Sequence, residues 1–442
     1  MKNLGNATLI LFLGLTFCSQ SFANIVKEGF FIQDPKGVYL AQLNRQGEFT
    51  VDHRSTQGYE LYGDEGTAEF LENQHIPFNQ IEEEMFKALG EKSGYPAPEE
   101  IGRQLQQIVA QNSEIMRLFS IGKSVEGRDL WVVKISNRPE QDQKKPEFKY
   151  IANMHGDEIV GREMMVKLID DLGKGYHQGD EQINKLVNNS EIYIMPSMNP
   201  DGALKRQRGN SRYVDLNRNF PDFSTSDNQN GPNGRAPETQ AVMGFQKDHN
   251  FGLSANFHGG AEVVNYPWDT IAEAHPLEKL VMDLSLHYAE SVPYIRDSRE
   301  FDRGIVNGYA WYEVNGGMQD WSYYWYGDLQ VTIELSGTKW PDYSKVSYYY
   351  NENRQALLDM IQDVQQGVGF YFSDATQAGQ INLTDEQGKK WGPYSFDKGE
   401  FYRVLPQGNY QVSITRQNRP EITKMVRVSP ADQFEAGYYL ID

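Results

Sequence analysis

Hydrophobic and polar positions in the middle of the chain switch between two periods. Short apolar and β-branched runs predict strands, and the stretches between them carry apolar residues at the spacing of one helix face. Strands are predicted at 130–136, 150–154, 191–195, 253–257 and 329–335. Helices are predicted over 99–118, 158–172, 237–247, 276–290 and up to about 365, with a polar loop over 199–234. This alternation predicts an α/β fold: a mixed, mostly parallel sheet flanked by helices, with active groups at the strand ends.

The pattern changes at both ends of this central unit, which spans 92–366. Beyond Gly367 the helical spacing stops, and short apolar runs are separated by Gly and Asp turns. This pattern of short apolar runs and turns predicts a C-terminal all-β sandwich over 367–442. Residues 24–91 contain a strand-like run at 48–52 and a short helical stretch at 66–73. They are expected to form a small N-terminal α/β region, whose role the pattern does not indicate.

Residues 1–23 have the pattern of a secretory signal peptide. Lys2 precedes the apolar run 7–17, and Ser21-Phe-Ala23 is a small-x-small cleavage site. We therefore expect cleavage after Ala23 and a secreted or periplasmic protein of bacterial type. Cys18 is the sole cysteine, so the processed chain is expected to have no disulfide. No other apolar run approaches the length of a bilayer, which predicts no stable membrane span.

The composition excludes some partners. The 442 residues include 42 Lys and Arg against 61 Asp and Glu, a net charge of −19. Such a charge argues against nucleic acid or an anionic membrane as the partner. An acidic surface suits cationic substrates, although it is equally compatible with a surface that only keeps the protein soluble.

Two histidines stand at the ends of predicted strands, each followed by glycine. His155 is followed three residues later by Glu158, where the chain turns into a helix, and His258 precedes Gly-Gly. Two imidazoles and one carboxylate are a ligand set typical of catalytic zinc, which keeps a fourth position open for water. Taken singly, either histidine is better explained as a hydrogen-bonded core residue; together they favour a metal site.

Two further motifs suggest a base and an anion clamp. Glu334 lies between β-branched and apolar neighbours, where burial of an ionised carboxylate requires a partner. The alternative is a solvated glutamate on an edge strand. Asn217 and Arg218 together offer several charge-assisted hydrogen bonds to a carboxylate. Their alternative is an Asx-rich turn with a surface arginine.

These residues carry a resemblance to the zinc metallocarboxypeptidases. The motifs that are similar are His155-Gly-Asp-Glu158, Asn199-Pro-Asp-Gly, Asp215-Leu-Asn-Arg-Asn-Phe-Pro, Phe257-His258-Gly-Gly, Asn315-Gly-Gly-Met-Gln-Asp-Trp and Thr332-Ile-Glu334-Leu. Within the family the chain resembles the regulatory branch of carboxypeptidases N, E, M and D. That branch carries a C-terminal transthyretin-like β-sandwich, which corresponds to 367–442. The resemblance covers roughly 92–442 and implies that 92–366 is the catalytic domain.

The resemblance implies a zinc-dependent peptide-bond hydrolase, with roles for the residues at matching positions. His155, Glu158 and His258 would hold one Zn²⁺. Asp215 would orient a ligand histidine, as metal-bound imidazoles generally need. Glu334 would be the general base that deprotonates the zinc-bound water and then protonates the leaving amine.

The resemblance also implies how a peptide with a free C-terminal carboxylate is held. Asn217 and Arg218 would clamp that carboxylate, and Tyr312 would close over it. Arg208 would polarise the scissile carbonyl; three other cationic residues crowd the same loop, and Arg208 is chosen because it stands nine residues before the clamp asparagine, as in the family.

Specificity follows from two further matching positions. Asp269 and Gln319 correspond to the pocket that receives the departing side chain, and a carboxylate with an amide acceptor suits Lys or Arg. Glu262 is a second acid nearby that could supply the charge instead. The expected activity is therefore removal of C-terminal Lys or Arg from peptides.

Two other functions fit the same residues less well. A hydrolase of peptidoglycan peptides on the same scaffold is conceivable, because diaminopimelate also offers an amine. A non-catalytic binding protein would be expected to lack a metal ligand or the base, and none is missing from this sequence.

Overall fold

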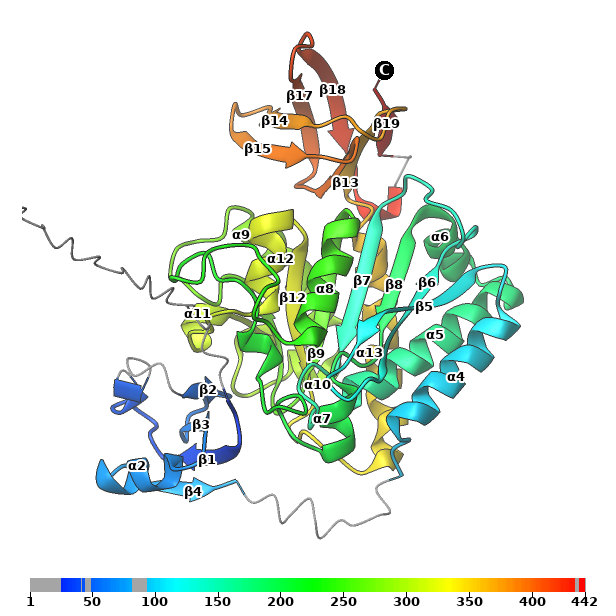
Figure 1. The fold of residues 1–442 in the computed structure, drawn as a ribbon. Coiled ribbons are helices and arrows are strands. Elements are labelled where there is room, and N and C mark those ends of the chain that lie inside the picture. Colours follow the sequence, from blue (N-terminus) through cyan, green and yellow to red (C-terminus); the bar gives the residue numbers. More distant parts are fainter. Residues whose placement is uncertain (1–24, 41, 44–48, 82–93, 434–436, 442) are drawn as a thin grey trace, which may run out of the picture.

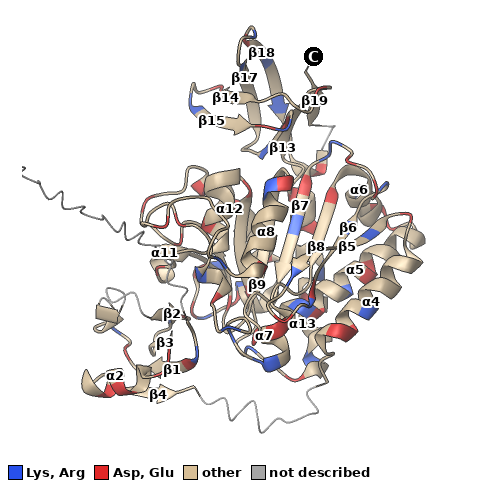
Figure 2. Cartoon of the chain, in the orientation of Figure 1, with Lys and Arg blue, Asp and Glu red and all other residues tan. Residues whose placement is uncertain are grey.

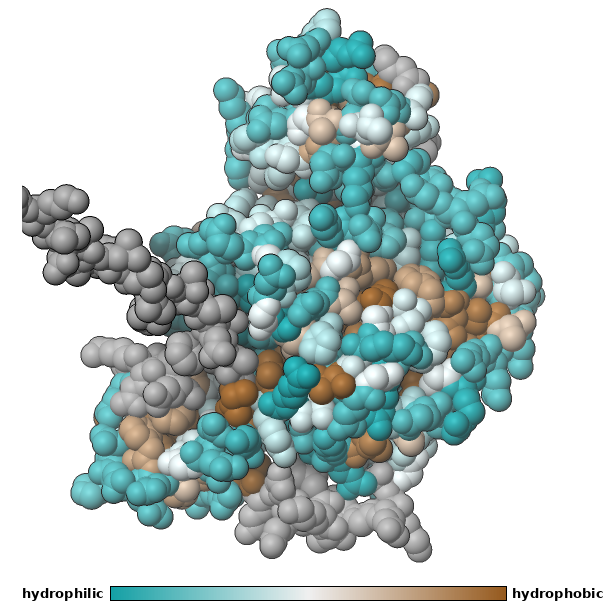
Figure 3. Space-filling view, viewed as in Figure 1, coloured by the Kyte–Doolittle hydropathy of each residue, from teal (hydrophilic) through white to brown (hydrophobic). Residues whose placement is uncertain are grey.

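The computed structural model describes residues 25–40, 42–43, 49–81, 94–433 and 437–441. The predicted signal peptide, with Cys18, lies outside these residues. Figure 1 shows a central α/β domain with the C-terminal strands stacked at one end and the small N-terminal region at the other. On the face seen in Figure 3, the β-sandwich is mostly hydrophilic, and hydrophobic residues gather over the central domain and the N-terminal region.

The central domain is built on one eight-stranded sheet with the order β11-β10-β12-β9-β7-β8-β6-β5. The strands are β5 (Met116–Lys123), β6 (Asp129–Ile135), β7 (Glu147–Ala152), β8 (Glu191–Met195), β9 (Phe251–His258), β10 (Glu262–Tyr266), β11 (Ile305–Asn307) and β12 (Leu329–Leu335). The pairs β12–β9, β9–β7, β7–β8 and β10–β11 are parallel, and the other three are antiparallel. The predicted mixed, mostly parallel sheet is confirmed.

Helices cover both faces of this sheet. The longer ones are α4 (Pro98–Gln111), α5 (Val160–Gln178), α6 (Glu181–Asn189), α8 (Pro237–Asp248), α9 (Glu278–Glu290), α12 (Met318–Tyr326) and α13 (Val346–Asp363). One core joins α4, α5, α6, α9 and α13 to the sheet, and a second core lies under α8 and α12. Every residue of β7, β9 and β12 is buried, as expected for parallel strands covered on both sides.

Two predicted boundaries were wrong. The helix predicted over 99–118 ends at Gln111, because the Asn112 side chain bonds the Ile108 carbonyl and β5 begins at Met116. The predicted loop over 199–234 contains the short helix α7 (Pro200–Lys205) and the 3₁₀ turn η1 (Leu216–Arg218). Side-chain caps from Asn199 and Asp215 stabilise these turns, and a polar run of this kind gives no helical period.

The N-terminal region has its own sheet and core. Its strands are β1 (Glu28–Ile32), β2 (Thr50–Asp52), β3 (Tyr59–Gly63) and β4 (Phe78–Gln80), in the order β2-β3-β1-β4, with helix α2 (Thr67–Asn73) beside them. Its buried apolar cluster centres on Phe30, Tyr59 and Leu61 and is separate from the cores of the central domain. We call residues 25–81 the N-terminal module.

The C-terminal strands form two sheets, with the orders β16-β13-β19 and β15-β14-β17-β18. Their bounds are β13 (Gly367–Tyr371), β14 (Gly379–Asp385), β15 (Lys390–Phe396), β16 (Glu400–Val404), β17 (Gly408–Arg416), β18 (Ile422–Val428) and β19 (Tyr438–Leu440). The apolar interior of this sandwich is continuous with the larger core of the central domain. Within the described residues, no helix is both long and apolar enough to cross a bilayer.

Candidate active site

Three adjacent parallel strands bring the predicted site residues to one edge of the sheet. Glu334 on β12 is directly paired with His258, the last residue of β9. β7 lies on the other side of β9 and ends at Ala152, three residues before His155. The carboxyl ends of parallel strands are where α/β folds commonly place reactive groups. The sheet order thus places three side chains from distant parts of the sequence side by side.

The three predicted zinc ligands converge on one point. Nδ1 of His155 lies 3.0 Å from Oε1 of Glu158, and Nδ1 of His258 lies 2.8 Å from Oε2 of the same carboxylate. The two Nδ1 atoms are 3.0 Å apart, and all three side chains are buried. Two imidazole Nδ1 atoms and one carboxylate thus meet within hydrogen-bond distance of one another. Two histidine nitrogens and a carboxylate are the ligands that zinc prefers in catalytic sites, so this set of side chains fits a zinc ion.

Asp215 orients the first of these histidines. Nε2 of His155 is 3.1 Å from Oδ1 of Asp215, and because a carboxylate accepts, this contact places a proton on Nε2 and directs Nδ1 toward Glu158 and His258. Asp215 caps η1 by accepting from the backbone of Asn217, and its other oxygen accepts from Nε of Arg208 at 2.9 Å. Burial alone would raise the pKa of Asp215, but Arg208 and His155 outweigh it and lower this pKa.

A small pocket opens beside this cluster. It is bounded by His155, His258 and Glu334 and by residues of the loops and helices around the strand ends: Asp52, Asn217, Arg218, Asn265, Asp269, Trp311, Tyr312, Val314 and Thr332. Oε2 of Glu334 is buried and has no hydrogen-bond partner among the described residues. A buried, unpartnered carboxylate oxygen costs stability, so it is a feature expected where a ligand or water completes the site.

The two predicted specificity residues contact each other. Nε2 of Gln319 donates to Oδ1 of Asp269 at 2.9 Å and to Oδ1 of Asn265 at 2.8 Å, which leaves the buried Oε1 of Gln319 without a partner in the described residues. Burial raises the pKa of Asp269 to about 7. Glu262 lies on β10, is half-buried, bonds the backbone of Gly337 and does not border the pocket. Of the two acids, Asp269 is thus the one that borders the pocket.

The structure also places residues in this site that sequence reasoning missed. Asp52 and His53, at the end of β2 in the N-terminal module, lie against the predicted catalytic side chains. Asp52 contacts Arg208 and Tyr312, and His53 lies beside Glu334. The sequence around them carries no motif, and only the packing of the module reveals them.

Comparisons with known proteins point to one family. The family model described as zinc carboxypeptidase matches residues 101–356. Mouse carboxypeptidase M is 38% identical over 358 residues, which cover 74% of this chain and 80% of that protein. The catalytic chain of human carboxypeptidase N is 33% identical over 387 residues, covering 77% and 84%. Duck carboxypeptidase D is 38% identical over 365 residues, but that match spans only 26% of its length.

Solved structures resemble the fold at lower identity. Carboxypeptidase A from Helicoverpa armigera superposes with a TM-score of 0.59 at 18% identity and covers 78% of this chain and 98% of that one. Thrombin activatable fibrinolysis inhibitor gives a TM-score of 0.57 at 16% identity, covering 77% and 99%. The fold agrees with theirs, and the sequence match extends over more than half of the chain. The protein belongs to the zinc carboxypeptidase family.

Proposed function

We propose that this metallocarboxypeptidase uses one zinc ion to remove C-terminal Lys or Arg from peptides. The observation that carries the proposal is the convergence of His155, Glu158 and His258 beside the unpartnered Glu334 carboxylate, at the mouth of a pocket that contains Asp269. A metal site, a base and an acidic pocket within one cleft are the elements that such a reaction requires.

Zinc held by His155, Glu158 and His258 would supply Lewis-acid polarisation and a water of lowered pKa. Glu334 borders the same pocket, with one carboxylate oxygen free to accept a proton from the attacking water. Having taken that proton, the same carboxyl is placed to return it to the departing amine. Asp215 keeps the His155 ring fixed in position while charge redistributes around it.

Arg208 is proposed to stabilise negative charge on the carbonyl oxygen of the scissile bond. Its guanidinium is buried and held by Nε to Asp215, and Nη1 lies 3.5 Å from Oε1 of Glu158. Nη2 has no hydrogen-bond partner in the part of the chain that the structure describes. A fixed cation with an unused donor in a buried site stabilises developing charge without reorganising.

The pocket residues are proposed to select the end of a peptide. Asn217 and Arg218 would bind the terminal carboxylate through charge-assisted hydrogen bonds, with Tyr312 beside them. Asp269, held by Gln319, would pair with the cationic head of the last side chain. Uptake of a buried carboxylate into such a pair favours its ionised form.

The proposal includes export of the protein, supported by the signal-peptide pattern of residues 1–23. It places the enzyme outside the cytoplasm, where the absence of cysteine after residue 23 makes its stability independent of disulfides.

The test combines metal content with a panel of short peptides that differ only in the last residue. We expect one zinc per chain and much faster release of Arg and Lys than of Phe, Leu or diaminopimelate. His155→Ala should lower zinc occupancy and abolish cleavage without unfolding the chain. Full zinc in that variant would show that the ligand assignment is wrong, and preference for Phe would refute the basic-residue assignment alone.

A further inference from the structure

A direct backbone contact joins two segments of the active site. The first follows β7 and carries two of the proposed metal ligands; we call residues 153–158 the ligand turn. The second follows α7 and carries Arg208; we call residues 206–214 the arginine loop. The backbone N–H of Gly156 donates to the carbonyl of Arg208 at 3.1 Å. The position of this arginine relative to the metal ligands is therefore set partly through its main chain.

Glycines allow the ligand turn to approach the start of α7. A Cβ atom on Gly156 would lie 2.1 Å from the backbone of Gly202, and one on Gly202 would lie 2.4 Å from Nδ2 of Asn199. Both distances are far shorter than a van der Waals contact, so any side chain at either position would separate the two segments. Backbone therefore lies against backbone here, close enough for one side chain to bond both segments.

Asn199 is the side chain that bridges them. It is fully buried, and its Nδ2 donates to the carbonyl of Met154 at 3.2 Å and to that of Arg208 at 3.3 Å. Its Oδ1 accepts from the backbone N–H of Gly202 at 2.9 Å, which caps α7. One amide group thus contacts the ligand turn, the arginine loop and the helix that lies between them in the chain.

Asn153 shapes the ligand turn from inside. It is the first residue after β7, is fully buried and has a φ of 56°. Asparagine is one of the few residues that adopt this left-handed conformation routinely. Its Nδ2 lies 2.9 Å from the carbonyl of His155 and 3.3 Å from the carbonyls of Gly156 and Glu158. One amide therefore gathers three carbonyls of the turn that presents both ligands.

The two asparagines are also bonded to each other. The backbone N–H of Asn199 donates to the carbonyl of Asn153 at 3.0 Å, and Oδ1 of Asn153 accepts from the hydroxyl of Ser197 at 2.8 Å. The oxygen and the nitrogen of each side-chain amide therefore have a partner. A buried polar network in which every member is paired holds a single arrangement, because any displacement leaves a polar group unsatisfied.

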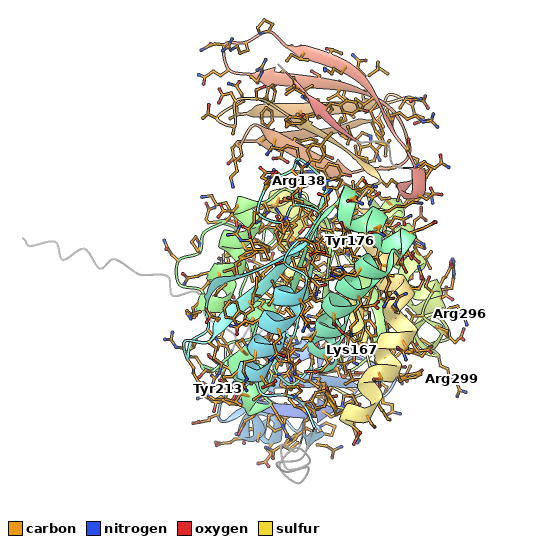
Figure 4. All side chains as sticks on the ribbon, turned by 90° about the vertical axis from the view of Figure 1, so that its right-hand side faces the viewer. Arg138, Lys167, Tyr176, Tyr213, Arg296 and Arg299 are labelled. Carbon is orange, nitrogen blue, oxygen red and sulfur yellow. The ribbon has the colours of Figure 1, made fainter. Side chains whose placement is uncertain are left out.

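The arginine loop is held at its tip as well as beside the ligand turn. The tip carries Tyr213, which is 38% exposed and is labelled in Figure 4 at the end of the molecule opposite the β-sandwich. There, Nδ2 of Asn210 donates to Glu238 of α8 at 2.9 Å. Loss of the bond from Asn199 would leave this outer anchor in place. The main chain of Arg208 could then shift relative to the metal ligands without unfolding of the loop.

We propose that Asn153 and Asn199 are positioning residues of the reaction. Asn153 holds the ligand turn in the shape that brings its two ligands together, and Asn199 fixes Arg208 relative to them. The inference rests on the proposed function, which assigns the metal to this turn and the scissile carbonyl to Arg208. Neither asparagine borders the pocket, so both act through the backbone. A misplacement of about 1 Å in a preorganised site can cost on the order of 10²-fold in rate.

The first test is Asn199→Asp. The change replaces the donor Nδ2 by an oxygen but keeps the cap of α7, because aspartate caps helices as well as asparagine does. An oxygen then faces the carbonyls of Met154 and Arg208, and the bridge is lost. We expect kcat for an Arg-ending peptide to fall by about 10–100-fold, with KM and zinc affinity nearly unchanged. An unchanged kcat would overturn the role of Asn199.

The second test is Asn153→Gly, which removes the amide but keeps the left-handed backbone that glycine adopts without strain. We expect the zinc dissociation constant, measured by competition with a chelator, to rise by about 10–100-fold. Asn153→Asp, which keeps the shape and loses the donor, should give the same result. Zinc affinity that is unchanged in both variants would overturn the role of Asn153.

Asn112 provides the matched control. It is 6% exposed, lies at the end of α4, and its Nδ2 also donates to a main-chain carbonyl, that of Ile108 at 2.7 Å. Asn112→Asp should lower stability and leave zinc affinity and kcat as in the parent. A loss of activity as large as that of Asn199→Asp would mean that any buried asparagine has this effect, which would overturn the proposal.

A double-variant cycle tests whether Asn199 acts through Arg208. Residues that act as a unit have non-additive effects, so the loss of Asn199 should matter little once Arg208 is removed. We expect Asn199→Asp to lower kcat/KM of Arg208→Ala by less than about threefold, against about 10–100-fold in the parent. Full additivity would show that Asn199 acts by another route and would overturn the proposal.

A binding measurement gives the same answer without altering Arg208. A phosphonate analogue of an Arg-ending peptide places negative oxygens where the scissile carbonyl would lie, whereas free arginine has no group there. We expect Asn199→Asp to weaken phosphonate binding by about 10–100-fold and to leave arginine binding unchanged. Equal weakening of both ligands would overturn the role of Asn199. Parent protein that binds zinc but cleaves no peptide would refute the proposed function instead.

Discussion

The two flanking units meet opposite ends of the same strand and differ in how they are attached. β9 begins against the β-sandwich, where Gly252 lies under Tyr402 and Val404, and it ends at the site, where Gly260 lies under His53. The sandwich shares a continuous apolar core with the central domain, whereas the N-terminal module keeps its own core and attaches mainly through polar contacts, with Ile25 as an apolar contact to the core under α8 and α12. An apolar junction cannot open without exposing hydrophobic surface, but charges that separate are solvated by water.

The comparison indicates that the sandwich is attached mainly by apolar packing and the module mainly by polar contacts. At the sandwich end, the hydroxyl of Tyr402 donates to the Val364 carbonyl, and Lys144 pairs with Glu400 beside the apolar contact. At the module end, the partners are site side chains that a ligand would also use. In Figure 2, acidic and basic segments are interspersed along the central domain, so charge by itself does not distinguish the two ends. The two ends differ instead in which residues make the contacts.

The variant with the largest expected effect tests whether the catalytic groups lie only at the carboxyl ends of the strands. Glu334→Gln retains shape but removes the proton acceptor, and turnover should fall by at least ~10²–10⁴-fold, the range of general acid–base groups. Glu400→Gln is the matched change near the opposite end of the sheet, where burial raises the pKa of the carboxyl to about 7. Steady-state kinetics should show a near-normal kcat for Glu400→Gln. Equal losses in both variants would break the comparison.

An intermediate effect tests the pocket beyond the metal site. Truncation of one partner of a buried charge pair commonly costs about 2–5 kcal/mol, so Asp269→Ala should lower kcat/KM for Arg-ending peptides by at least ~30-fold. Peptides ending in Leu should be almost unaffected. Equal losses on both substrates would assign Asp269 a structural role in the turn that Asp320 also supports through backbone hydrogen bonds.

The same pocket predicts a pH dependence. Burial raises the pKa of Asp269 to about 7, with Asp222 and Asp320 as acidic neighbours and Arg218 as the opposing cation. Below this pKa the carboxyl is neutral and does not pair with a cation. The ratio of kcat/KM for Arg over Leu peptides should therefore fall as pH is lowered through about 7. Asp269→Asn should abolish this dependence, and a flat ratio in the parent enzyme would contradict the assignment.

The smallest expected effect concerns the sandwich junction. Tyr402→Phe removes one buried hydrogen bond to the Val364 carbonyl and should lower the free energy of unfolding by about 1–3 kcal/mol, since the carbonyl is left unsatisfied. Peptidase kinetics should not change. The check is denaturant unfolding together with kcat/KM, and a change in kinetics without a change in stability would show that the junction communicates with the site.

The sequence predicted most of the fold because strands and helices of the central domain differ in period. β8 and β12 agree with their predicted bounds, since both are fully buried and rich in apolar and β-branched residues. The C-terminal strand β15, with a Gly-Pro step and exposed positions, was not predicted, because it has neither alternation nor a continuous apolar run. Short capped helices such as α7 were missed for the same reason. The domain boundaries stay predictions.

The candidate site was predictable where one local motif marks a strand end. His155 follows an apolar strand, His258 ends one, and Glu334 is the last residue but one of a third, and the sheet order then places them together. Their catalytic roles stay predictions. Asp52 and His53 had no such signal, since their partners in the central domain lie more than 150 residues away in the chain. Contacts of that kind depend on how two separately folded units dock, which no local pattern encodes.

The cations of the cleft have a consequence for how substrates arrive. Arg208, Arg218 and Lys339 gather around the site of a protein whose net charge is −19. Low-dielectric walls would focus their field into a local attraction for anions, inside a molecule that repels them at a distance. Carboxylate termini would then be drawn in only within about 10 Å, the screening length at 0.1 M salt. Encounter with a peptide would accordingly combine long-range attraction of its basic side chain with short-range capture of its terminus.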